Sequence, residues 1–202
     1  MSEESGNKTI DITKYSPPNR HTCLFYSSKD ELLDILAPYF KAGLENNEFC
    51  LWVVPDDWKT KEAKMALSKT VKDLEVYIEK GQMVIGDYKE YYLRSGAFGA
   101  FKMLEYWAKR EKEVLGQGFN EIRISADGGW ALGEYWITLN LYEKEVNRII
   151  DEHRMIAICT YFINKLELQQ ISDIGMSHQS ALVKRMGQWN SLEPSDFSTM
   201  KF

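Results

Sequence analysis

The hydrophobic positions of the chain fall into short continuous runs, separated by longer segments in which apolar residues recur every three or four positions. Each run is rich in apolar or β-branched residues and is bounded by turn or charged residues, which is typical of a buried strand. The predicted strands cover residues 21–26, 49–54, 83–87, 121–125 and 155–161.

The segments between these runs have the spacing of amphipathic helices, most clearly over residues 32–44, 98–108 and 136–149. Strands that alternate with helices of this length form parallel βαβ units. We therefore predict an α/β fold with a single doubly wound, mostly parallel sheet and helices on both faces. A last strand, around residues 181–186, is expected to run antiparallel and to pair at an edge.

The two ends of the chain differ from this central pattern. Residues 1–18 are polar and finish in two prolines, which predicts a mobile leader. Residues 191–202 are expected to form a loose tail. The remainder, residues 19–190, is long enough to bury a substantial core as one domain.

Composition narrows the function classes. The formal net charge of -5 provides no basic field for nucleic acid, and no apolar run is long enough to cross a membrane. Three cysteines without a CxxC pair indicate a reducing compartment. We expect a cytoplasmic protein without nucleic-acid or membrane partners. No GxSxG or HExxH motif is present, so we predict no catalytic residues and expect no cofactor for catalysis.

In open parallel sheets, ligands bind beyond the carboxyl ends of the strands. The strand ends of this sequence are rich in aromatic and acidic residues, which suits a small-molecule pocket. An aspartate at a strand end, as at Asp127, can hold Mg²⁺ or accept from a ligand, but it can equally cap its own turn. The predicted ligand-binding residues are Tyr26, Ser27, Ser28, Lys29, Asp56, Trp58, Asp127, Gly128, Trp130 and Tyr161.

Cysteines and histidines offer a weaker hypothesis, a metal or redox site. No pair among them has a recognised metal-ligand spacing, and cysteines within strands are usually small buried hydrophobes. His21 also lies at the amino end of its strand, away from the expected ligand edge. The candidates for such a site are His21, Cys23, Cys50, Cys159 and His178.

Several segments together resemble a known family. HTCLFYSSKDELLDILAPYFKAGLENNEFCLWVVPDDW, QMVIGDYKEYYLRSGAF, IRISADGGWAL, ICTYFINKL and HQSALVKRMGQW occur in the order found in the MEDS domain, a sensory domain of methanogens and methylotrophs. The resemblance covers about residues 20–190. It implies sensing of small molecules such as simple hydrocarbon derivatives. The layout also resembles RecA/KaiC-type ATPases, with residues 27–30 in the place of the phosphate loop.

The chain departs from the ATPase pattern at this loop. It reads SSKDE, without the glycines of GxxxxGK[ST], and its one lysine, Lys29, is followed by Asp30 and Glu31, which would repel a polyanion. We therefore predict a non-catalytic sensory domain that signals through a partner protein (a kinase or a transcription regulator) or through self-association into a homo-oligomer. The alternatives are a residual nucleotide binder or weak ATPase, a Cys/His metal or redox sensor, and a protein–protein adaptor.

Overall fold

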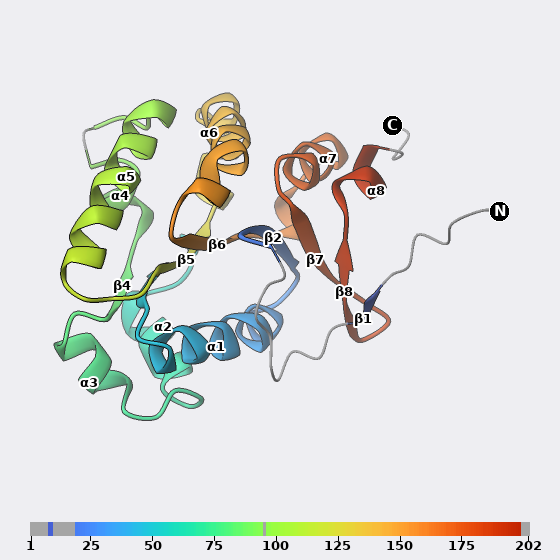
Figure 1. The fold of residues 1–202 in the computed structure, drawn as a ribbon. Helices are drawn as coiled ribbons and strands as arrows, with labels where there is room; N and C mark the ends of the chain where they lie inside the picture. Colours follow the sequence, from blue (N-terminus) through green and yellow to red (C-terminus); the bar gives the residue numbers. More distant parts are fainter. Residues whose placement is uncertain (1–7, 10–18, 95, 199–202) are drawn as a thin grey trace.

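The computed structural model describes residues 8–9, 19–94 and 96–198, and these residues build one eight-stranded sheet with helices on both faces (Figure 1). The strand order is β1-β8-β7-β2-β6-β5-β3-β4. The strands are β1 (Lys8–Thr9), β2 (His21–Tyr26), β3 (Phe49–Val53), β4 (Met83–Gly86), β5 (Ile122–Asp127), β6 (Met155–Phe162), β7 (Ser180–Arg185) and β8 (Gln188–Leu192). The helices are α1 (Lys29–Glu45), α2 (Thr60–Leu67), α3 (Leu74–Glu79), α4 (Tyr88–Tyr91), α5 (Ala100–Gly116), α6 (Trp136–Ile149), α7 (Leu168–Met176) and α8 (Pro194–Ser198).

The predicted fold class is confirmed. Strands β7, β2, β6, β5, β3 and β4 are neighbours in that order, and each pair is parallel. All five predicted strands are present with ends shifted by at most two residues. Burial on both faces explains why these segments read as continuous apolar runs.

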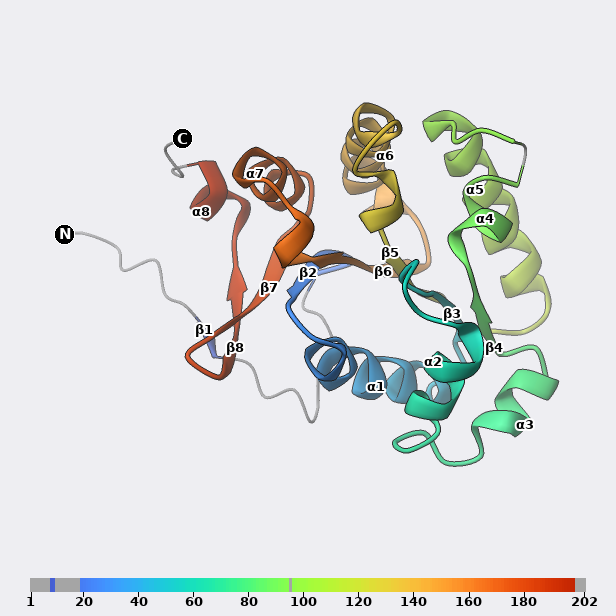
Figure 2. The same ribbon diagram turned by 180° about the vertical axis from the view of Figure 1, so that it is seen from behind.

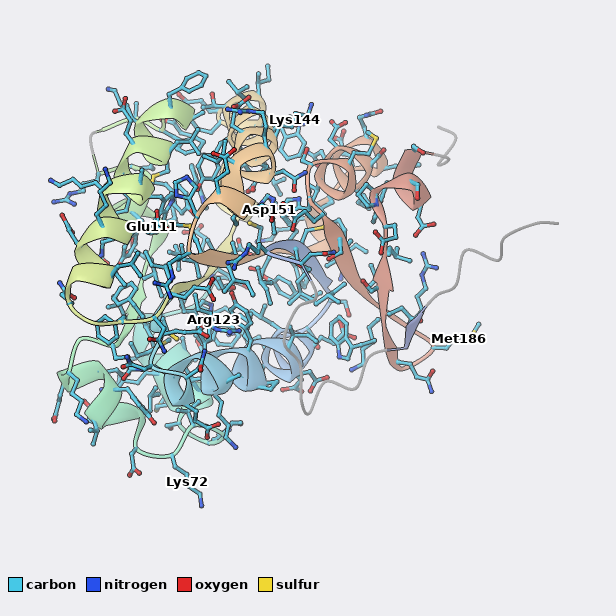
Figure 3. All side chains as sticks on the ribbon, viewed as in Figure 1. Lys72, Glu111, Arg123, Lys144, Asp151 and Met186 are labelled. Carbon is cyan, nitrogen blue, oxygen red and sulfur yellow. The ribbon has the colours of Figure 1, made fainter. Side chains whose placement is uncertain are left out.

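Helices α1, α2 and α3 cover one face of the sheet, and α4 to α8 cover the other (Figures 1 and 2). Alternation along each strand divides the buried side chains between two hydrophobic clusters. In β5, for example, Ile122 and Ile124 face the α5–α6 side, whereas Arg123 points between the sheet and α1 (Figure 3). The two faces therefore have separate cores with separate polar groups.

The antiparallel strand expected near the C-terminus is present, but it is β8 rather than residues 181–186. Residues 181–185 belong to β7, which runs parallel to β2 because α7 returns the chain before β7 begins. The reversal comes at Met186 and Gly187, whose φ values of 50° and 77° are those of a two-residue hairpin turn. Methionine seldom adopts this conformation, so residue types alone did not predict the turn. Met186 projects from the tip of the hairpin (Figure 3).

The structure corrects the predicted tail and part of the predicted leader. Residues 191–192 complete β8, and residues 194–198 form α8. The ring of Phe197 in α8 is buried directly against Gly175, where a larger residue would collide with it. The loose-tail prediction is therefore wrong for these residues, and 199–202 lie outside the described residues. In the leader, Lys8–Thr9 pair with β8 as β1, while residues 1–7 and 10–18 lie outside the described part of the chain.

Candidate functional site

The carboxyl edge of the sheet forms a small cavity of about 50 Å³. It collects half of the predicted ligand-binding residues, namely Tyr26, Asp56, Asp127, Trp130 and Tyr161. The other predicted residues, Ser27, Ser28, Lys29, Trp58 and Gly128, do not line it. Trp58 is instead buried against Trp52, and Gly128 leaves room for the Tyr161 ring, with which a Cβ would collide.

Asp127 is fully engaged by its own surroundings. Its Oδ2 accepts hydrogen bonds from the Tyr26 hydroxyl at 3.1 Å and from the Thr160 hydroxyl at 3.3 Å, and its Oδ1 accepts from Gly129 N–H at 2.9 Å. Burial raises the pKa of Asp127 to about 6, although these hydrogen bonds oppose the rise. Of the roles we considered for Asp127, capping its own turn is the one that these contacts describe.

The loop at residues 27–31 is closed by a carboxylate. Glu31 Oε2 accepts from Ser27 N–H at 2.8 Å and from Ser27 Oγ at 2.6 Å, while Ser28 Oγ caps α1 by accepting from Glu31 N–H at 3.2 Å. Lys29 turns away to pair with Glu62 at 2.7 Å. The donors that a phosphate would need are therefore already bound to a group of the same charge.

The predicted Cys/His candidates divide into two groups. His21, Cys159 and His178 come together on the α5–α6–α7 side of the sheet, whereas Cys23 and Cys50 stay outside this cluster. Cys50 belongs to the opposite core. The members of the cluster come from β2, β6 and the segment after α7, so no local sequence spacing could have revealed it.

Sequence reasoning missed Glu143, the residue around which this cluster is built. Glu143 projects from α6 and is buried, with 5% of its surface exposed. Its Oε2 lies 3.1 Å from His21 Nε2 and 3.5 Å from both Cys159 Sγ and His178 Nε2, and its Oε1 accepts from the Tyr161 hydroxyl at 3.0 Å. A signal was available: a charged residue at position 143 lies in the apolar stripe of the helix predicted over residues 136–149.

A second cavity, of about 40 Å³, lies beside this cluster between α5, α6 and the sheet. Its walls are mostly apolar and include Leu104, Ala108, Val146, Ile150 and Ala157. His21, Glu143 and Cys159 also line it, so the cavity ends on the buried polar cluster.

Near the cavity, α5 is tied to the segment that follows α6. His153, which also lines the cavity, makes a 2.6 Å contact from Nδ1 to Oε2 of Glu111 on α5. Glu111 Oε1 accepts from the backbone N–H of Arg154 at 2.6 Å. Glu111 points from α5 towards the sheet (Figure 3). This pairing fixes the spacing of the two helices that flank the cavity.

Comparison with known proteins identifies the family. Residues 20–179 match MEDS, the methanogen/methylotroph, DcmR sensory domain. The chain belongs to the MEDS family. It is also 24% identical over 162 residues to the transcriptional repressor DcmR of Methylorubrum extorquens, a match that covers 79% of this chain and 58% of the repressor. The MEDS chain thus spans little more than half the length of that relative.

Solved structures support the fold of this MEDS domain. A KaiC-like protein of Pyrococcus horikoshii OT3 superimposes with a TM-score of 0.57 at 15% identity, covering 93% of this chain and 88% of its own. An uncharacterized protein of Pyrococcus horikoshii, solved with an unknown peptide, gives a TM-score of 0.56 at 12% identity, covering 87% and 84%. The RecA/KaiC-like layout predicted from the sequence is confirmed.

The family and the repressor relative together indicate a sensory, regulatory role for this MEDS domain. No helix among the described residues is long and apolar enough to span a membrane. The cytoplasmic location stays a prediction. The same is true of the expectation that the protein has no nucleic-acid partner.

Proposed function

We propose that this MEDS domain binds a small, mostly apolar molecule in the cavity between α5, α6 and the sheet, and that occupancy of this cavity is the signal it reports. The observation that carries the proposal is the make-up of the cavity: apolar walls that end on three buried polar side chains, His21, Glu143 and Cys159. Small-molecule sites typically combine an apolar enclosure with a few polar groups that fix orientation.

The size of the cavity limits the ligand. One water molecule occupies roughly 10–15 Å³ of cavity volume when the volume is measured with a water-sized sphere. On the same measure this cavity has about 40 Å³, so without rearrangement it accommodates a molecule of only a few heavy atoms. A short hydrocarbon chain with one polar atom fits the walls and can direct that atom towards Glu143. This chemistry agrees with the simple hydrocarbon derivatives that the family resemblance implies.

The test is ligand-dependent stabilisation in a variant with a filled cavity. Alcohols, thiols and amines of one to three carbons are the probes, and a probe at 100 times its Kd should add about 2.7 kcal/mol of stability. For a chain of this size the Tm should then rise by roughly 5–10 °C. Ala108→Leu places a larger side chain in the cavity and should abolish the rise.

The matched control is Ala66→Leu, which changes a half-buried alanine on α2, at the other face of the sheet. This variant should keep the wild-type response to each probe. An unchanged response in Ala108→Leu, or an equal loss in both variants, would place the ligand elsewhere.

The carboxyl edge is the second candidate site, and the observation that favours it is its wall of Tyr26, Asp56, Asp127, Trp130 and Tyr161. Its acidic groups suit a more polar ligand. Trp130→Ala separates the two sites: it should leave probe binding intact if the ligand lies between α5 and α6, and it should remove binding if the ligand lies at the edge.

We further propose that the domain is non-catalytic and passes its state to a partner protein, a kinase or transcription regulator, or to another copy of itself. The two hydrogen bonds from Ser27 to the Glu31 carboxylate support the absence of nucleotide chemistry, because they occupy donors that a phosphate would need. Isothermal titration with ATP and Mg²⁺ should show no binding at millimolar nucleotide. Binding that disappears in Asp127→Ala would instead support the residual ATPase alternative.

A further inference from the structure

Four side chains with metal-ligating atoms converge beneath α6. They are His21 from β2, Glu143 from α6, Cys159 from β6 and His178 after α7, and their ligand atoms all lie within 4.8 Å of one another. Both histidines are completely buried, and Glu143 and Cys159 expose only 5% and 9% of their surface. Among the described residues, this is the one group of at least three such side chains that is close enough to hold a metal ion.

His178 provides an independent sign that something is bound here. Its Nδ1 lies 2.7 Å from the carbonyl oxygen of Ile174, and because a carbonyl only accepts, Nδ1 must carry the proton. Its Nε2 has no hydrogen-bond partner among the described residues and faces Glu143 Oε2 at 3.5 Å. With its proton on Nδ1, the ring presents the lone pair of Nε2 to a carboxylate. A cation between the two atoms would satisfy both.

Four of the six distances between the ligand atoms are close to those of a tetrahedral site, and all six are within 4.8 Å. Zinc bonds of about 2.0–2.2 Å to nitrogen or oxygen and about 2.3 Å to sulfur place tetrahedral ligands about 3.4 Å apart, or about 3.6 Å apart for pairs that include sulfur. The carboxylate Oε2 of Glu143 lies 3.1 and 3.5 Å from the two Nε2 atoms. Cys159 Sγ lies 3.6 Å from His21 Nε2 and 3.5 Å from Glu143 Oε2.

The surrounding hydrogen bonds orient these groups, as hydrogen bonds to the far atoms of the ligand side chains do in known metal sites. His21 Nδ1 donates to Asn147 Oδ1 at 3.2 Å and His178 Nδ1 to the Ile174 carbonyl, so each Nε2 turns inward. The Tyr161 hydroxyl holds the other carboxylate oxygen of Glu143. The two imidazole rings stack with centroids 4.0 Å apart, which disfavours a positive charge on both.

Charge balance also calls for a cation. Among the described residues, the ion-pair contacts of Glu143 are to His21 and His178 alone, without a lysine or arginine. A divalent ion bound by one carboxylate, one thiolate and two neutral imidazoles makes a neutral buried centre. Binding would displace the thiol proton of Cys159, which donates towards Glu143 Oε2 in the metal-free protein.

We propose that His21 Nε2, His178 Nε2, Cys159 Sγ and Glu143 Oε2 bind one divalent transition-metal ion of the zinc class. Two nitrogen ligands, one thiolate and one carboxylate in a tetrahedral arrangement suit Zn²⁺ and its spectroscopic substitute Co²⁺. The ion can enter through the cavity between α5 and α6, which reaches three of the four ligands. The metal site goes beyond the proposed sensory function and stands without it, because the ion requires no small-molecule ligand in the cavity.

The experiment is a Co²⁺ titration of the full chain after removal of bound metal with a chelator. The wild-type protein should bind one Co²⁺ per chain and show the visible d–d bands of tetrahedral cobalt with a thiolate-to-cobalt charge-transfer band, both abolished by added Zn²⁺. Cys159→Ser should lose the charge-transfer band. His178→Gln should weaken cobalt binding by at least about tenfold. Cys50→Ala, a buried cysteine on the opposite face, should behave as wild type.

Two results would overturn the proposal: a wild-type spectrum of octahedral or unbound cobalt, or equal affinity in the wild type, Cys159→Ser and His178→Gln, which would indicate binding at the surface. Because a cluster variant can fail to fold, X-ray absorption at the metal edge of the wild-type protein provides a second readout. One sulfur and three nitrogen or oxygen neighbours are expected, and a shell without sulfur would contradict the proposed site. Failure of the short-chain probes to bind would leave these results unaffected.

Discussion

Two buried glutamates, Glu48 and Glu143, lie on opposite faces of the sheet, and they differ in whether a positively charged side chain is bound to them. Glu48, on the α1 side, is bound by Arg123 through Nε at 2.6 Å and Nη2 at 3.2 Å, and Asn46 donates to its Oε1 at 2.7 Å. The guanidinium of Arg123 also lies over the ring of Tyr39, 4.5 Å from its centroid. The charge of Glu48 is therefore compensated within the fold.

Glu143, on the α5–α6 side, has no lysine or arginine partner in the part of the chain that the structure describes. Its neighbours are two imidazoles, a thiol and a phenol, none of which carries a permanent positive charge. The comparison shows that burial of a carboxylate does not by itself indicate function. What distinguishes Glu143 is that its partners carry no permanent positive charge and that it lies next to a cavity, through which a bound cation can supply one.

Breaking the Glu48 pair should have the largest effect on stability. Glu48→Gln leaves Arg123 as a buried charge without its counter-ion, which costs about 3–5 kcal/mol. Tm should fall by roughly 10 °C or more in thermal unfolding followed by circular dichroism. A loss below about 1 kcal/mol would show that Arg123 reaches solvent and that Glu48 is not the compensated glutamate described here.

Asp127 is a third buried carboxylate, and its hydrogen-bond donors are neutral. The pH dependence of stability tests how these surroundings affect its charge. Its pKa is raised from 3.8 to about 6, so its charged form is disfavoured in the folded protein. The contribution of protonated Asp127 to the free energy of unfolding should therefore be fully present below about pH 4. It should be lost, by about 3 kcal/mol, as the pH rises through 6. Urea unfolding across this pH range measures the slope, and Asp127→Asn should remove it. An equal slope in the variant would assign the titration to another group.

Glu143→Gln should have a much smaller effect than Glu48→Gln, and this is the sharpest form of the comparison. In metal-free protein the amide can donate to the unpartnered His178 Nε2 while its oxygen still accepts from Tyr161. We expect stability within about 1 kcal/mol of wild type, because no buried cation is left behind. A loss of about 3–5 kcal/mol would mean that a protonated His21 compensates Glu143 as Arg123 compensates Glu48.

Met186→Asn should have the smallest effect and serves as a reference remote from both glutamates. Asparagine tolerates the left-handed backbone of the hairpin better than methionine, so the free energy of unfolding should rise by roughly 0.5 kcal/mol. Urea unfolding measures the gain, and cobalt binding should not change. A loss of stability would show that the exposed Met186 side chain makes a contact that matters.

The sequence predicted the sheet well because parallel strands buried on both faces appear as short apolar runs bounded by turn or charged residues, whereas the helices of this chain show apolar residues every three or four positions. It misplaced the antiparallel strand because the turn that creates β8 depends on Met186, a residue with little preference for that conformation. It also treated residues beyond 190 as a tail, although Phe197 fills the space above Gly175 and anchors α8.

The candidate site was harder to predict, for a physical reason. His21, Cys159 and His178 lie on three separate elements and meet only because β2 lies between β6 and β7. Their spacing along the chain carries no information about this meeting. Glu143 was visible as a charge in an apolar helical stripe, and that local inconsistency was the better indicator of a site than any motif.

Xenon binding tests most directly whether the proposed ligand cavity lies between α5 and α6, because xenon enters apolar cavities of this kind. A crystal of the wild-type protein under xenon pressure should show the atom between α5, α6 and the sheet, next to Ala108 and Ala157, and a crystal of Ala108→Leu should not. Xenon at the carboxyl edge beside Trp130, or an empty α5–α6 cavity in the wild type, would contradict the account.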